Sequence, residues 1–179
     1  MILRDLLLLI LMRIGFCEYC GNNKIPYGIE VHRDGRVLLL CSKPDCFDKK
    51  YAECDERPLR TDGCPSNSTW VGGLQRTSDL KVLYTQCCEY EYLADYSEIQ
   101  YKKVVVRRGE FFEGEEKQES NGDVSAFDLI TNIHLGHDEK GEFYAIQVHR
   151  YFCGKAPDPD PAWSPKDPWP HFNLKHKKH

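Results

Sequence analysis

The chain has 179 residues, of which 41% are hydrophobic and 12% aromatic, and it carries a formal net charge of −4. This length is typical of one domain with short appendages, and the apolar fraction is sufficient for a core of its own. The slightly acidic balance offers no broad basic surface, which excludes nucleic-acid binding as the main function.

Residues 1–17 have the organisation of a secretory signal peptide. A short charged opening leads into the apolar run 6–12, which is about one third of the length that a membrane-spanning helix needs. Such a run predicts a removable signal peptide and no transmembrane span. Gly15 and Cys17 supply the small residues that cleavage requires, so we expect the cut after Cys17. Arg13 departs from the pattern and leaves a cut a few residues away open. The alternative, a buried or amphipathic helix, lacks helical periodicity.

Alternating apolar and polar residues, rich in valine and tyrosine, predict a β-rich domain after the signal peptide. We expect strands at 35–41, 81–93, 99–108, 127–135 and 142–152. The last two ranges flank a turn and are predicted to form an antiparallel hairpin.

A period of two also predicts which side chains share a face. In 81–93 these are Val82, Tyr84, Cys88, Tyr90 and Tyr92. In 127–135 they are Phe127, Leu129, Thr131, Ile133 and Leu135, and in 142–152 they are Tyr144, Ile146, Val148 and Phe152.

Helix is scarce in this sequence. The best candidate runs from Ser42 to Cys54, with Ser42 as the N-cap and Pro44 in the first turn. Residues 110–123 are expected to form an acidic, hydrophilic loop. The predicted fold class is therefore mainly β, with one or two short helices and disulfide-stabilised antiparallel sheets in a single small domain.

The C-terminal residues 154–179 differ sharply in composition from the rest. Prolines at nearly every other position in 154–170 predict an extended linker without a core, which also carries Trp163 and Trp169. A basic, histidine-containing tail follows. We therefore divide the chain into a signal peptide (1–17), a disulfide-rich domain (18–153) and this linker with its tail.

The cysteine count supports the same division. Nine cysteines are an odd number, which is unusual for a secreted protein, and cleavage after Cys17 leaves eight. Eight cysteines in an oxidising compartment predict four disulfides, although the sequence does not choose among the roughly one hundred pairings. Adjacent Cys87 and Cys88 point to opposite faces of a strand, which suits two disulfides better than one zinc site. The predicted disulfide cysteines are Cys20, Cys41, Cys46, Cys54, Cys64, Cys87, Cys88 and Cys153.

One modification site stands out. Asn67-Ser68-Thr69 is an N-glycosylation acceptor triplet in a run of turn-forming residues. We expect Asn67 to be exposed and, in a secreted protein, to be glycosylated.

The remaining chemistry-bearing residues do not form a recognisable catalytic or metal site. The chain has no phosphate-binding loop, serine-hydrolase elbow or zinc-protease motif, so we expect no enzyme activity and no cofactor. His134 and His137 are the most metal-like pair, but on a strand leading into a turn they would point to different sides. His32 and His149 are isolated and are interpreted as surface or cross-strand residues. His171, His176 and His179 are interpreted as part of a solvated tail, or of one that contacts acidic matrix polymer.

Short motifs occur in a fixed order along residues 20–153. They are Cys20-Gly21, Ile25-Pro26-Tyr27 with Glu30, Gly35, Leu40-Cys41-Ser42-x-Pro44-x-Cys46-Phe47, Cys54, Cys64, Trp70-Val-Gly-Gly73, Cys87-Cys88-x-Tyr90, Gly114-Glu-Glu116, Phe127-Asp-x-Ile-x-Asn-Ile133, Tyr144 and Val148-x-Arg150-x-x-Cys153. In combination these motifs resemble the Wart domain of nematode warthog proteins, a hedgehog-related family.

The resemblance implies a secreted protein associated with intercellular signalling, development, epidermis or cuticle. In the longer members a self-splicing Hog module follows the Wart domain and begins with Gly-Cys-Phe. Here the order is Phe152-Cys153-Gly154, and only 26 residues follow Cys153. We therefore expect a Wart domain alone, with neither autoprocessing nor self-catalysed sterol attachment.

Three functional hypotheses follow. The first is an extracellular or cell-surface signalling ligand that binds a receptor through its loops, with patched-related proteins as the candidates that the family implies. The second is a structural or interaction component of apical matrix or cuticle. The third is a carrier of small lipids held between β-sheets. In each case we expect no nucleic-acid partner and no stable membrane insertion after signal cleavage.

Overall fold

The computed structural model describes residues 17–21, 24–43 and 53–154. Within these ranges the chain forms antiparallel β-sheets and a short helix, which confirms the predicted fold class. The elements are β1 (Cys17–Tyr19), β2 (Ile25–Val31), β3 (Val37–Ser42), β4 (Glu53–Cys54), β5 (Thr69–Arg76), β6 (Leu83–Glu89), α2 (Leu93–Tyr96), β7 (Ser97–Arg107), β8 (Phe111–Glu113), β9 (Glu116–Gln118), β10 (Val124–Asp138) and β11 (Gly141–Phe152). No helix in the described ranges is long and apolar enough to cross a membrane.

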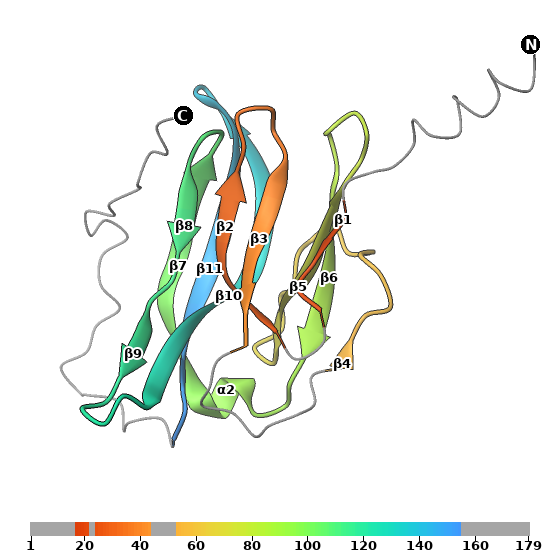
Figure 1. Ribbon diagram of the computed structural model, residues 1–179. Coiled ribbons are helices and arrows are strands. Elements are labelled where there is room, and N and C mark those ends of the chain that lie inside the picture. The colour runs from red at the N-terminus through yellow and green to blue at the C-terminus, as the bar shows by residue number, and fades with distance from the viewer. Residues whose placement is uncertain (1–16, 22–23, 44–52, 155–179) are drawn as a thin grey trace, which may run out of the picture.

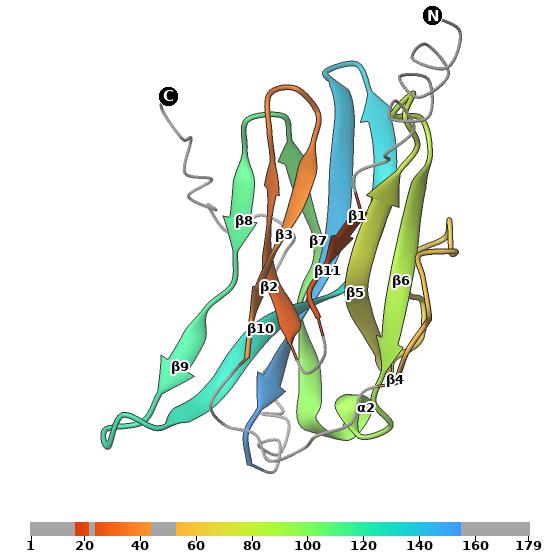
Figure 2. The same ribbon diagram turned by 45° about the vertical axis from the view of Figure 1, so that its right-hand side comes forward.

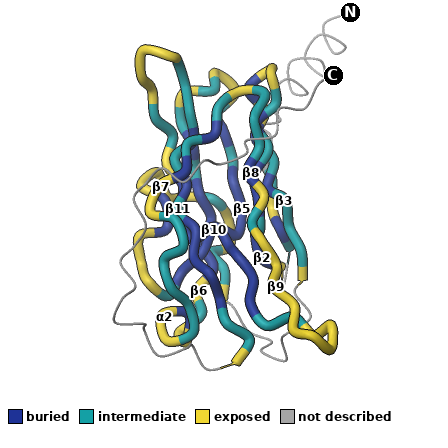
Figure 3. The backbone as a smooth tube through the Cα atoms, turned by 90° about the vertical axis from the view of Figure 1, so that its left-hand side faces the viewer, coloured by how far each residue is buried: buried dark blue, intermediate teal, exposed yellow. Residues whose placement is uncertain are grey.

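The strands form three sheets, with the orders β1-β5-β6-β4, β7-β11-β10-β9 and β3-β2-β8. The first sheet lies on one side of the molecule and the other two lie opposite it (Figures 1 and 2). Apolar side chains of all three sheets meet between them. This main core includes Ile29 of β2, Val71 and Leu74 of β5, Val106 of β7 and Tyr144 of β11. The middle of the strands is buried and the turns are exposed (Figure 3).

The predicted hairpin is confirmed by β10 and β11, which pair from Ala126–Phe152 to Asp138–Gly141. The prediction of one continuous apolar face was wrong, because the register shifts between Ile130 and Asn132. A bulge of this kind moves the following side chains to the other face. Phe127 and Leu129, before the shift, therefore pack in a second, smaller core with Trp70 and Tyr151, whereas Ile133, after the shift, packs in the main core.

The predicted strand 81–93 is shorter than expected, and its two faces pack in different cores. Cys88 of the predicted face lies in the second core, with Tyr90 packed against it. β6 ends at Glu89, and Leu83 and Cys87 pack in the main core, whereas Tyr84 is half-buried. Tyr92 is exposed, in a turn in which the Leu93 N–H donates to the Tyr90 carbonyl at 3.0 Å. Tyrosine is amphipathic and tolerates partial exposure, so the tyrosine pattern did not show that the opposite face also packs in a core.

Two other expectations were wrong. Ser42 is the last residue of β3 and Cys54 lies in β4, so neither end of the expected helix is helical; residues 44–52 lie outside the described residues. The expected acidic loop 110–123 contains β8, which pairs with β2, and β9, which pairs with β10. Both are short edge strands, where charged residues are common, so the acidic composition concealed their strand character.

Candidate functional site

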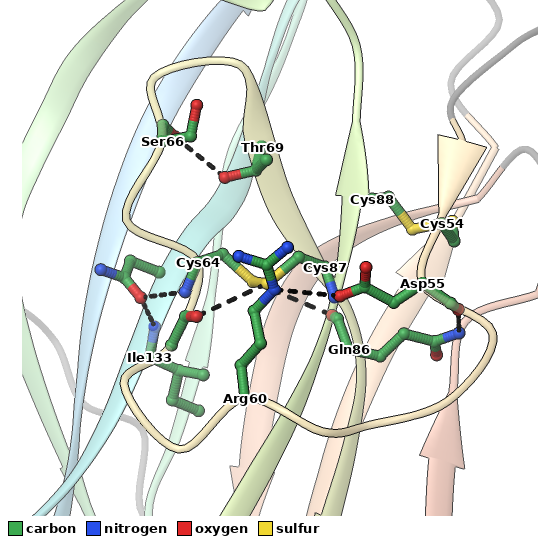
Figure 4. Close-up of a disulfide and its surroundings, with 12 residues drawn as sticks. Cys54, Asp55, Arg60, Cys64, Ser66, Thr69, Gln86, Cys87, Cys88 and Ile133 are labelled. Carbon is green, nitrogen blue, oxygen red and sulfur yellow. Dashed lines mark hydrogen bonds and ion pairs between the residues drawn. A yellow bond between two sulfur atoms is a disulfide. The ribbon is translucent and has the colours of Figure 1, made fainter.

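Two disulfides fix the two faces of β6. Cys87 bonds to Cys64 on the core side, and the adjacent Cys88 bonds to Cys54 of β4 (Figure 4). This arrangement follows from the alternation of side chains on a strand. Gly72 lies directly beneath the Cys88 sulfur, where any side chain would collide with it. The chain from Cys54 to Cys64 is thereby fastened at both ends to one strand.

Two further cysteines tie the other layers together. Cys20 follows β1 and is disulfide-bonded to Cys41 of β3, so the link joins two different sheets. Cys153 is also disulfide-bonded, whereas Cys46 lies outside the described residues. Each closed loop of this size typically contributes about 2–4 kcal/mol to stability, mainly by restricting the unfolded chain.

A single amide holds the Cys64 segment against the opposite layer. Asn132 Oδ1 of β10 accepts hydrogen bonds from the backbone N–H groups of Cys64 and Ile133, both at 2.8 Å. A side chain at Gly63 would lie 2.7 Å from the Ile133 carbonyl oxygen, so this close approach requires glycine, whose φ of 76° is also unfavourable for other residues. Asn132 therefore couples the disulfide segment to the bulge in β10.

The predicted acceptor Asn67 is exposed, in the turn before β5. Thr69 of the same triplet is buried, and its hydroxyl donates to the Ser66 carbonyl at 2.9 Å. The acceptor side chain and the hydroxyl thus lie in one compact turn. Glycosylation at Asn67 remains a prediction.

The candidate histidines lie apart. In the described residues no group of three or more His, Cys, Asp or Glu side chains is arranged to hold a metal ion. His134 and His137 are exposed on β10, and His32 lies in the turn after β2. His149 is buried, with Nδ1 3.0 Å from the Ser97 hydroxyl, and burial lowers the pKa of His149 to about 4. His171, His176 and His179 lie outside the described residues.

A buried ion pair joins β10 to β11. Arg150 donates to both carboxylate oxygens of Asp128, at 2.8 and 3.1 Å, and also to Glu115 at 3.1 Å. The Glu115 N–H donates back to Asp128 at 3.0 Å. A side chain at Gly114 would lie 2.6 Å from the Asp128 Cβ, so the glycine of the Gly114-Glu-Glu116 motif permits this contact. The pair fixes the β8–β9 segment onto the hairpin.

A second ion pair connects β5 to β11. Arg76 donates to both oxygens of Glu142, at 2.8 and 2.9 Å, and to the Tyr144 hydroxyl at 2.8 Å. Burial disfavours the charged forms of both Arg76 and Glu142. The hydrogen bonds and the attraction between the two groups outweigh this effect, so the pKa of Arg76 is raised and the pKa of Glu142 is lowered. Burial raises the pKa of Tyr144 to about 12. Arg108 approaches the same Glu142 carboxylate at 3.6 Å.

Four polar turns gather at the end of the molecule beyond this ion pair (Figures 1 and 2). We call them the turn crown; they are residues 32–36, 77–82, 108–110 and 139–140. A side chain at Gly35 would lie 3.3 Å from Arg108 Nη2 and 3.4 Å from Leu80 Cδ1, so three of the turns touch. Leu80 has a φ of 60°, which is rare for a leucine. Exposed polar turns on a rigid scaffold are typical binding surfaces.

Sequence reasoning indicated three of these turns, but neither the turn at 77–82 nor the crown. Turn-forming residues such as Asp34-Gly35 and Lys140-Gly141 gave the only signal, because the contacts join segments far apart in the chain. The Arg76–Glu142 pair, which spans 66 positions, had no sequence signal.

The fold and these sites define a disulfide-stabilised β-domain that presents polar turns on a rigid scaffold. The chain belongs to the Warthog family, since the model of the Warthog N-terminal signalling domain matches residues 17–154. This confirms the family resemblance.

Curated relatives cover most of the chain. It is 44% identical to Warthog protein 3 of Caenorhabditis elegans over 93% of both chains, and 50% identical to Warthog protein 5 of the same organism over 87% of both. Warthog protein 6 is 29% identical over 78% of this chain but over only 25% of its own length. No solved structure matches.

Proposed function

We propose that this protein is a secreted, hedgehog-related signalling ligand that acts without catalysis, by binding a cell-surface receptor through the turn crown. Membership of a family named for its signalling domain supports a signalling-related role. The observation that carries the surface assignment is the crown itself: three of its four turns touch, and the Arg76–Glu142 ion pair joins β5 to β11 beneath it. A preorganised surface loses little conformational entropy on binding.

The charges of the crown favour a polar partner surface. Arg33, Glu139 and Lys140 are exposed, and Asp34 forms an exposed ion pair with Arg36 at 2.7 Å. Charges of both signs at fixed positions give specificity and faster association more than raw affinity. Patched-related membrane proteins remain the receptor candidates that the family implies.

The test is binding of the purified mature protein to cells that express candidate receptors. We expect saturable binding, and at least a tenfold weaker affinity for a double charge reversal, Arg33→Glu with Lys140→Glu. Lys117→Glu is the matched control, because Lys117 is exposed on β9, away from the crown. Absence of saturable binding, or an equal loss in the control, would contradict the proposal.

Secretion is tested separately. Expression of the full chain in cultured animal cells should deliver protein to the medium with an N-terminus at Glu18, carrying glycan at Asn67. N-terminal sequencing and mass before and after glycosidase treatment measure both. Protein that stays inside the cell with residues 1–17 still attached would contradict secretion.

A matrix role is the competing proposal, prompted by the proline-rich segment with Trp163 and Trp169, which lies outside the described residues. Extraction of tissue with detergent alone distinguishes the two. Release of the protein favours a diffusible ligand, and retention favours covalent incorporation into matrix.

A further inference from the structure

The outer face of β7 and β11 presents cations around an aromatic ring. Val104 and Val106 of β7 are buried in the main core, so the alternating residues Lys103, Val105 and Arg107 lie on the opposite face. Phe143 of β11 is paired with Arg107 in the register of the two strands. This part of the sheet lies away from the core.

Phe143 is held in a fixed position on this face. A side chain at Gly136 of the neighbouring strand β10 would lie 2.6 Å from Cε2 of the ring, so the ring covers the glycine. Lys103 Nζ lies 5.6 Å and Arg107 Cζ 5.2 Å from the ring centroid. Such cation–π contacts position the two cations near the same ring.

The positive charge of this face is incompletely balanced. Arg107 is paired with Asp138, at 2.6 and 3.0 Å. Lys102 and Lys103 are exposed, and no carboxylate of the described residues lies within ion-pair distance of either. A local excess of cations in a chain with a net charge of −4 indicates a site for an anionic partner. Lys102 is exposed at the register shift of β7, where strict alternation is interrupted, next to Lys103. We call Lys102, Lys103, Arg107 and Phe143 the lysine face.

The backbone of β7 argues against an acidic peptide that would add as a further strand. β7 is an edge strand, but its register with β11 shifts between Ile146 and Val148, opposite Lys102 and Lys103. A bulge and lysines on an edge strand both oppose pairing with another strand. A linear polyanion that contacts side chains does not need a continuous backbone edge.

We propose that the lysine face binds a sulfated polysaccharide, whose repeated anionic groups contact Lys102, Lys103 and Arg107 along β7. Arg107 lies five residues after Lys102 on the strand, about 17 Å away, so several sugar units fit between the first and the last cation. This contact would retain the protein near its site of release. It uses residues outside the turn crown and is independent of receptor binding.

The test uses immobilised heparin as the probe, with the folded, disulfide-bonded chain in solution. Wild-type protein should bind at 0.15 M NaCl with an affinity that falls steeply as salt is raised. The Lys102→Gln, Lys103→Gln double variant should bind about tenfold more weakly. The slope of log affinity against log salt should decrease by about two, because two ionic contacts are lost.

Lys117→Gln is the matched control, since it removes one exposed lysine from β9 and should leave heparin affinity within twofold. Desulfated heparin should bind at least tenfold more weakly than heparin. Wild-type protein that does not bind heparin at 0.15 M NaCl overturns the proposal, as does a double variant that binds normally. The proposal is also overturned if poly-glutamate binds as tightly as heparin and the double variant loses both to the same extent. That result would indicate an acidic peptide as the partner.

Discussion

At the residue scale, Asn132 has an effect on the structure that its position in the chain does not suggest. Its amide oxygen serves two backbone N–H groups, one of them 68 residues away. The alternation of 127–135 predicted a strand around Asn132, and the family motif included it, but neither indicated its partner. Long-range side-chain contacts depend on tertiary packing, which a single sequence does not specify.

We predict that Asn132→Ala lowers the free energy of unfolding by about 2 kcal/mol, because two backbone donors lose their acceptor in a partly buried site. Urea unfolding followed by fluorescence measures the change. Asn121→Ala is the control, since Asn121 lies in an exposed turn and bonds only to Asp123. Equal losses in the two variants would contradict a specific role for Asn132.

A second residue-scale prediction concerns pH. Burial lowers the pKa of His149 to about 4, from an unfolded value near 6.5, so the folded state favours the neutral ring. The resulting stability is present above pH 6.5 and is lost as the pH falls toward 4, by about 3 kcal/mol in total. The Ser97 hydroxyl donates to the Leu93 carbonyl at 2.6 Å, so its oxygen is placed to accept a hydrogen bond from the Nδ1–H of neutral His149.

The measurement compares wild type with His149→Gln between pH 7 and pH 4.5. The stability of the wild type should fall more steeply, so the difference between the two proteins should shrink as the pH is lowered. Parallel curves would show that His149 does not carry the effect.

At the scale of elements, local signals predicted the β10–β11 hairpin and the approximate positions of β3 and β7. The alternation of each strand and the turn between them were enough. They did not predict the bulge at Ile130–Asn132 or the edge strands β8 and β9. The bulge depends on tertiary packing, because β10 contributes side chains to both cores. A short charged edge strand forms only when a longer neighbouring strand pairs with it.

The Arg150–Asp128 pair tests how the hairpin holds the β8–β9 segment. Asp128→Asn should lower the free energy of unfolding by about 3–5 kcal/mol, because it leaves the buried Arg150 without its main counter-charge. Asp62→Asn, an exposed substitution, should change it by less than about 0.5 kcal/mol. Denaturant midpoints at pH 7 provide the comparison. A loss below about 1 kcal/mol in Asp128→Asn would show that water or Glu115 satisfies Arg150 instead.

At the scale of the whole molecule, the parity of the cysteines predicted a disulfide-stabilised domain, and the alternation of Cys87 and Cys88 predicted bonds on both faces of one strand. The pairings themselves were not predictable, because they depend on which sheets face one another. Cys64–Cys87 closes a separation of 23 residues and Cys20–Cys41 one of 21, so chain entropy predicts almost equal contributions, about 3 kcal/mol each.

The native structure makes these two disulfides unequal. Cys64 and Cys87 are both buried in the main core, and the Cys64 N–H is bonded to Asn132 of the opposite layer, whereas Cys41 is only partly buried. Replacing Cys64 and Cys87 together with alanine should therefore lower the free energy of unfolding by about 1–2 kcal/mol more than replacing Cys20 and Cys41, because it leaves a cavity between the layers. Urea unfolding of both double variants measures the difference. Equal decreases in the free energy of unfolding would mean that both disulfides stabilise the protein only by restricting the unfolded chain. Packing of the buried sulfurs between the layers would then contribute nothing measurable.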